Sequence, residues 1–167
     1  MDLTTILFLI GIFLLLGGLV ALIVFRKKPA VQSVLSSSPI SNQMQLQAYE
    51  RLTLLVDRIS LPNLISRLNQ SGIGAMEMQL LLTQTIRQEF EYNITQQIYV
   101  SIDAWNAVKT LKDQNLLLIN QIANSLPANA SGFDLNKKIL DFLVNDKRGQ
   151  LHEATSEVLS FEAKKLL

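Results

Sequence analysis

The chain of 167 residues contains no cysteine and a single histidine, His152. Disulfides, Cys/His zinc sites and cysteine nucleophiles are therefore excluded, because each needs at least one cysteine. Glu153 follows the histidine, but Ser156 occupies the second histidine position of an H-E-x-x-H zinc motif. We therefore expect no metal, no cofactor and no catalytic residue, and we expect that the protein is not an enzyme.

A basic excess is also missing from most of the chain. Three of the 15 basic residues are Arg26, Lys27 and Lys28, and one of the 14 acidic residues, Asp2, precedes them. The remainder carries 12 basic and 13 acidic residues, a formal net charge of −1. A surface that binds nucleic acid needs a basic patch or stripe. The charge balance therefore predicts no nucleic-acid partner.

The most distinctive feature that is present is an apolar run. Residues 3–25, LTTILFLIGIFLLLGGLVALIVF, contain no charged side chain, and the whole chain has a mean hydropathy of +0.25. A helix of this length crosses a hydrocarbon core of about 30 Å. A cleaved signal peptide would instead have a basic start, a shorter apolar stretch and a small-residue cleavage site. We therefore interpret residues 1–28 as an uncleaved transmembrane anchor with its basic flank.

The basic triplet predicts how the anchor is oriented. Arg26, Lys27 and Lys28 flank only its C-terminal end, and basic residues beside a span stay in the cytoplasm. We expect a single-pass protein of the bacterial cytoplasmic (inner) membrane, with the N-terminus outside and the C-terminal domain in the cytoplasm. Gly17 and Ala21 form a small-xxx-small pair, which would permit homo-oligomers through the anchor.

Beyond the anchor, the sequence predicts a linker and an all-α domain. Residues 29–41, PAVQSVLSSSPIS, have the proline and serine content of a flexible linker. Apolar residues then recur at helical spacing. The expected helices cover about 42–59, 63–70, 75–92, 101–125, 133–144 and 149–167, with a turn at Gly72-Ile73-Gly74. Residues 42–167 should therefore form a helical bundle of four to six helices.

The apolar stripes of these helices predict which residues form the core. They are Met44, Ala48, Leu52, Leu55 and Ile59; then Met78, Leu82, Ile86 and Phe90; then Trp105, Val108, Leu111, Asn115, Leu118 and Ile122. Residues 93–100 remain open at this point. They are a break between helices, part of one continuous helix, or a short strand, since Ile98, Val100 and Ile102 alternate with polar positions.

Aromatic side chains gather in residues 89–109. Because Phe90 and Trp105 fall on apolar helical stripes, we expect them to be packed in the core. Tyr92, Gln96, Gln97 and Tyr99 lie at or within the uncertain segment instead, and we predict them to be the surface that contacts a partner.

Three stretches also resemble a known family: QAYERLTLLVDRIS, LISRL and IRQEFEYNITQQIYVSIDAWNAVK. They are similar to a family of small uncharacterised bacterial proteins that have one N-terminal transmembrane helix, a linker and a helical cytoplasmic domain. The resemblance covers about residues 45–125. It implies this architecture, and it implies no activity, cofactor or catalytic residue.

Together these observations predict a membrane-tethered interaction or scaffold module. Its expected partners are the lipid bilayer and another protein. The alternative is a helical domain near the membrane whose interior binds a ligand or a lipid, which would need an apolar cavity with a few polar groups.

Overall fold

The structure, a computed structural model, describes residues 39–146 and 150–167. Its elements are α2 (Pro39–Ile59), α3 (Leu61–Leu68), α4 (Ala75–Tyr92), the 3-10 helix η1 (Ile94–Ile98), α5 (Ile102–Asn124), α6 (Gly132–Asn145) and α7 (Leu151–Lys164). The only β pairing within these ranges is an isolated antiparallel bridge between Gly74 and Ser131. The described part of the chain is all-α, with six α-helices, as predicted.

The chain divides into two compact units, Met1–Ser36 and Ser37–Leu167. The predicted anchor, residues 1–28, lies outside the described residues. None of the helices that are described has both the length and the apolar character needed to cross a membrane. Helix α2 begins at Pro39, so residues 39–41 of the expected linker are helical. Proline suits the first turn of a helix because its fixed φ is helical and its missing N–H has no intrahelical acceptor there.

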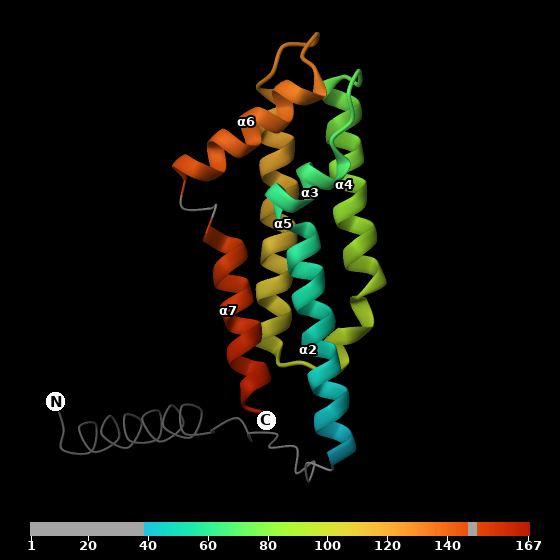
Figure 1. Ribbon diagram of the computed structural model, residues 1–167, viewed down its shortest axis with the longest axis vertical. Coiled ribbons are helices and arrows are strands. Elements are labelled where there is room, and N and C mark those ends of the chain that lie inside the picture. Colours follow the sequence, from blue (N-terminus) through green and yellow to red (C-terminus); the bar gives the residue numbers. More distant parts are fainter. Residues whose placement is uncertain (1–38, 147–149) are drawn as a thin grey trace, which may run out of the picture. The chain divides into compact units, whose positions relative to one another are not determined.

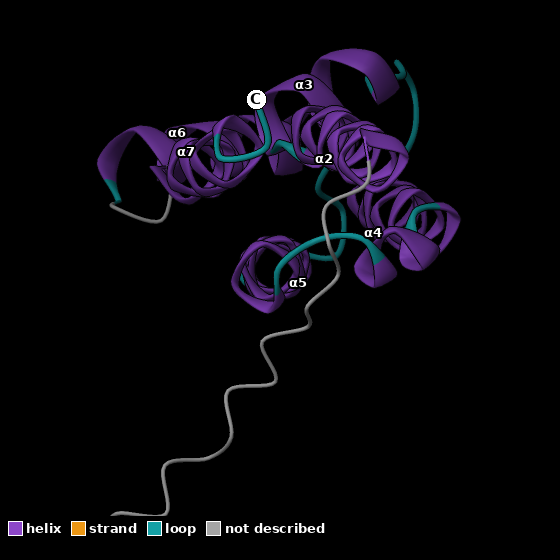
Figure 2. Ribbon diagram, turned by 90° about the horizontal axis from the view of Figure 1, so that it is seen from below, coloured by secondary structure: helices purple, strands orange, loops and turns teal. Residues whose placement is uncertain are grey.

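Helices α2, α4, α5 and α7 lie side by side, and α3 and α6 cross one end of this group (Figures 1 and 2). Helix α2 packs against α7, α4 against α5, and α5 also against α7. Helix α6 packs on α4 and α5, and α3 joins it at the same end. The result is a four-helix group with two shorter helices across one end.

The predicted stripes of α4 and α5 are buried along their whole length, which confirms the helical spacing. On α2, four of the five predicted residues are buried, whereas Met44 is 44% exposed. Met44 lies in the first turns of α2, and the buried positions of that helix begin at Ala48. Tyr49 and Val56 complete the buried face of α2.

The uncertain segment 93–100 contains a 3-10 helix, so the interpretation as a break between helices is confirmed and the strand is wrong. Ser101 caps α5, because its Oγ accepts a hydrogen bond from the backbone N–H of Ala104 at 3.2 Å. Asn93 ends α4, and its Nδ2 donates to the Glu89 carbonyl at 2.9 Å. The chain therefore turns from α4 into α5 through a single short corner.

The loops before α4 and α6 are joined by backbone hydrogen bonds. The N–H of Ala75 donates to the Ala130 carbonyl, and the N–H of Gly132 donates to the Ile73 carbonyl, both at 2.9 Å. Gly72 has φ +86°, a conformation that glycine adopts without strain. The predicted Gly-Ile-Gly turn is confirmed, and it fixes where two helices begin.

Candidate functional site

The four residues predicted to contact a partner lie at the corner between α4 and α5. Tyr92 is 80% exposed, Tyr99 is 36% exposed and Gln97 is exposed, but Gln96 is only 9% exposed. In a 3-10 helix, residues three apart lie on the same side. Gln96 therefore shares the inner side with Asn93, which is 7% exposed. The structure brings three of the predicted residues to the surface and buries the fourth.

Apolar residues that the prediction missed are exposed at the same corner. Ile94, Ile98 and Ile102 are 44%, 72% and 76% exposed. With Tyr92 and Tyr99 they define what we call the corner surface. Their spacing of four was visible in the sequence, but Ile98 and Ile102 were assigned to a possible strand. Monomeric proteins seldom expose large apolar side chains in groups, and such groups mark interaction sites.

A pair of buried rings supports this corner from inside. The Phe90 and Trp105 ring centroids are 5.1 Å apart, and the ring planes are tilted by 30°. Each residue is 9% exposed, and the ammonium of Lys112 lies 4.6 Å from the Phe90 centroid. Offset aromatic pairs add about 0.5–1.5 kcal/mol beyond their burial. The prediction that Phe90 and Trp105 pack in the core is confirmed, and the rings join the end of α4 to the start of α5.

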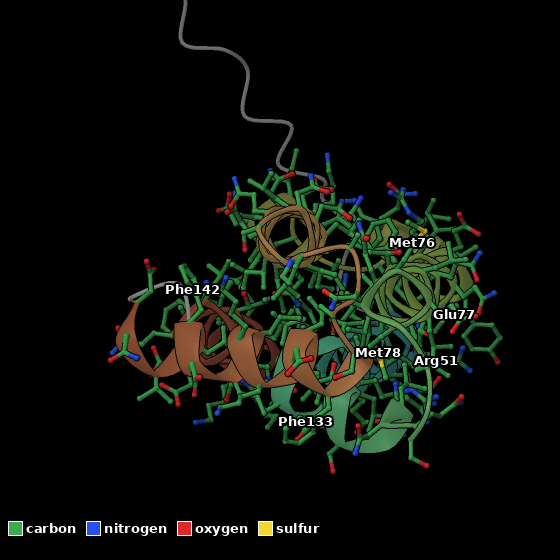
Figure 3. The ribbon with its side chains drawn as sticks, turned by 90° about the horizontal axis from the view of Figure 1, so that it is seen from above. Arg51, Met76, Glu77, Met78, Phe133 and Phe142 are labelled. Atoms are coloured by element: carbon green, nitrogen blue, oxygen red, sulfur yellow. The ribbon has the colours of Figure 1, made fainter. Side chains whose placement is uncertain are left out.

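A groove of about 450 Å³ lies between α2 and α4 and reaches the corner at Tyr92. Its lining also includes Arg51, Leu54, Arg58 and Glu89. Figure 3 labels Arg51, one of the cationic residues that line this groove. The groove thus combines an aromatic ring, an aliphatic side chain and charges of both signs.

An ion pair connects the two walls of the groove. Arg58 Nε donates to Glu89 Oε1 at 2.8 Å, and Arg58 Nη2 lies 2.6 Å from the same oxygen. This hydrogen bond and the attraction of the carboxylate raise the pKa of the Arg58 guanidinium. Arg67 Nη2 lies 3.7 Å from Glu89 Oε1. The contact between Arg58 and Glu89 thus joins α2 to α4 across 31 residues of sequence.

The single histidine, for which the sequence predicts no catalytic or metal-binding role, lies apart from the corner. His152 is half-buried on α7, far in the sequence from the corner. Within residues 39–146 and 150–167, no group of three His, Asp or Glu side chains could hold a metal ion. The Arg26-Lys27-Lys28 triplet, predicted to orient the anchor, lies outside the described residues. Exposed tyrosine, isoleucine and arginine side chains are the groups that the corner and its groove offer, and protein interfaces are rich in aromatic residues and arginine.

Comparison with known proteins places the whole chain in one family. No curated protein and no solved structure matches it. The model of a family described as a family of unknown function (DUF7935) matches residues 2–166. This match is consistent with an uncharacterised family, and it covers α6, α7 and the apolar run as well as residues 45–125. The chain therefore belongs to the family of unknown function DUF7935.

Proposed function

We propose that this protein is a membrane-tethered helical interaction module on the cytoplasmic face of a bacterial membrane, without enzymatic activity. One observation supports this more than any other. The corner surface, which comprises Tyr92, Ile94, Ile98, Tyr99 and Ile102, is exposed on a bundle whose interior is filled by packed side chains. Burial of exposed apolar area contributes about 25 cal/mol per Å², so a protein partner would be stabilised on this corner.

The tether is supported by the sequence of the N-terminal segment. Its uncharged run of 23 residues is followed directly by Arg26, Lys27 and Lys28. The family match begins at residue 2, so the run and the bundle both lie within the region that the family model covers. A tether confines the bundle to the membrane face and raises its effective concentration for a partner there. Binding at the corner can then be weak in solution and still be effective at the membrane.

The alternative function, a bundle interior that binds a ligand or a lipid, has less support. It needs a cavity near the centre of the bundle, and Trp105 is its most suitable wall. Trp105 is 9% exposed and its ring lies against Phe90. The groove between α2 and α4 opens at the surface of the bundle and contains the ion pair of Arg58 with Glu89. We therefore favour a partner that covers the corner from outside.

Crosslinking in cells tests the interaction. A photo-reactive amino acid replaces Tyr99 in the full chain, and a matched variant carries it at Gln121, an exposed position of α5 away from the corner. We expect one discrete adduct from position 99 and none from position 121. The adduct should disappear when Ile98→Asp is added, because a charge on the corner opposes burial. The same weak adducts from both positions would contradict the proposal.

Fractionation tests the tether independently. We expect the full chain to stay with membranes after washing at high pH, and a variant that lacks residues 1–28 to be released. A full chain that is washed off would contradict the anchor. The crosslinking result would still decide whether the corner binds a protein.

A further inference from the structure

Helix α6 has two apolar faces, and the bundle uses only one of them. Leu135 and Ile139 point inward and are fully buried. Phe133 and Val144 are 66% and 85% exposed, and Leu140 is 37% exposed. Figure 3 shows Phe133 and Phe142 on opposite sides of the α6 ribbon, and Phe133 lies on the side of α3, where it lines an open groove with Ile65 and Asn69. A helix that only covers a core needs a single apolar stripe, so the outer stripe requires another explanation.

The spacing of the outer stripe suits a second helix. Phe133, Lys137, Leu140 and Val144 follow one another at steps of four, three and four. This is the repeat of residues that face a partner where two helices pack along their length. Lys137 is exposed in the middle of the stripe. Such a stripe accepts a helix whose own stripe provides apolar groups and a carboxylate opposite the lysine.

A second copy of α6 meets this requirement. Lys137 and Asp141 lie one turn apart on the same flank of the stripe, and both are exposed. If two copies pack antiparallel, with the two-fold axis between residues 138 and 139, Lys137 of each copy lies level with Leu140 of the other and about 1.5 Å along the axis from its Asp141, within reach of that carboxylate. Phe133 then faces Val144, a large side chain opposite a small one. A parallel pair would instead place the two Lys137 side chains together, which is unfavourable.

Within the described residues, Lys137 and Asp141 form no ion pair with another side chain, although Lys137 lies near enough to Asp134 to lower the pKa of that carboxyl. We propose that the outer face of α6, made of Phe133, Lys137, Leu140, Asp141 and Val144, is a homodimer interface in which two copies of α6 pack antiparallel. The interface follows the symmetry of most homodimers, since the same surface of each copy meets itself.

The interface is small. Helix α6 has 14 residues, which gives a contact about 21 Å long. Stable interfaces bury at least about 1,000 Å², so this pair of helices associates weakly and depends on a high local concentration. The dimer rests on the proposed tether for its local concentration, but it does not depend on the proposed function of the corner, which lies at the other end of α4.

Single cysteines test the pairing in the full chain, because the natural sequence has none. In the antiparallel pair, the two copies of residue 140 are offset by about 5 Å along the helix axis, and the two copies of residue 133 by about 17 Å. Leu140→Cys should form an interchain disulfide in isolated membranes under mild oxidation. Phe133→Cys and the α5 control Gln121→Cys should not. Equal crosslinking at 133 and 140 would overturn the antiparallel pairing, and no crosslinking at 140 would overturn the interface.

Charge exchange tests whether the partner is a second copy. In the Leu140→Cys background, Lys137→Glu or Asp141→Lys alone should lower the disulfide yield by about fivefold, because each places like charges across the interface. The double variant restores opposite charges and should restore the yield. Because Lys137 and Asp141 are exposed, we expect each substitution to leave the fold intact, and circular dichroism of each variant checks this. A double variant as poor as the single ones would overturn self-pairing, as would single variants without effect.

Discussion

The hydroxyl oxygen of Tyr49 accepts a hydrogen bond from the backbone N–H of Ser101 at 3.0 Å, across 52 residues of sequence. Tyr49 lies on α2 and is 5% exposed, and Ser101 caps the start of α5. The bond satisfies a donor that a helix start leaves without an intrahelical acceptor. It also attaches the corner between α4 and α5 to α2, so that the corner surface is held by three helices.

Replacement of this tyrosine tests the attachment. Tyr49→Phe keeps the ring but leaves the Ser101 N–H without its acceptor, which costs about 1–3 kcal/mol for a buried donor. We expect the free energy of unfolding of the full chain in mild detergent to fall by about 1–2 kcal/mol. Urea unfolding, followed by the fluorescence of the single tryptophan, measures it. Tyr92→Phe is the control, since Tyr92 is 80% exposed and should change little.

Two glycines, Gly74 before α4 and Gly132 at the start of α6, allow a matched pair of variants. A Cβ at Gly132 would lie 3.1 Å from Met78 Cβ and 3.3 Å from the Ile73 carbonyl oxygen, whereas a Cβ at Gly74 meets nothing within 4 Å. We expect Gly132→Ala to lower the free energy of unfolding by about 1–3 kcal/mol, as overpacking does. Gly74→Ala, at the N-cap of α4, should cost less, because its Cβ meets open space and only the capping preference is lost. Thermal unfolding of both variants measures the difference. Equal stability of the two would show that the loops can move apart.

Much of the bundle could be predicted because its helices have one regular apolar face. Met78, Leu82, Ile86 and Phe90 recur every four residues, and the structure buries each of them on α4 within the predicted bounds. Local spacing is sufficient there because the helix period alone determines which side chains share a face.

The corner and the groove were harder to predict, for two physical reasons. In the short 3-10 helix the period changes from 3.6 to 3, so Gln96 turned inward although it lies between exposed neighbours. The pair of Arg58 with Glu89 depends on how α2 and α4 pack, and a charge pair 31 residues apart has no local signal. Lysine and glutamate spaced four apart, which sequence analysis can recognise, contribute little on an exposed face.

Two buried asparagines allow opposite predictions. Asn115 Nδ2 donates to the Ile59 carbonyl at the end of α2 at 2.8 Å. Asn136 Nδ2 donates to Asn69 Oδ1 at 3.2 Å, but its Oδ1 has no hydrogen-bond partner among the described residues. We expect Asn115→Leu to lower the free energy of unfolding by about 1–3 kcal/mol, because a buried carbonyl loses its donor.

Asn136→Leu should be neutral or stabilising by up to about 1 kcal/mol, because it removes a buried acceptor without a partner. Urea unfolding of both variants gives the comparison. A strong loss from Asn136→Leu, equal to that from Asn115→Leu, would indicate that a water molecule or another group satisfies the Asn136 oxygen.

The start of α6 predicts how stability depends on pH. Asp134 Oδ2 accepts hydrogen bonds from Ser131 Oγ at 2.7 Å and from the Ser131 N–H at 2.9 Å. These bonds lower the pKa of the Asp134 carboxyl from its ordinary value of 3.8, and the nearby Lys137 contributes in the same direction. A carboxyl whose pKa is lower in the folded state stabilises the fold above its ordinary pKa, and this stabilisation is lost as the pH falls through the folded value.

Asp134→Asn removes the ionisation, so the stability advantage of the natural chain over this variant should be constant near neutral pH and shrink below about pH 4. Urea unfolding at a series of pH values measures it, and an advantage that stays constant down to pH 2.5 would contradict the assignment.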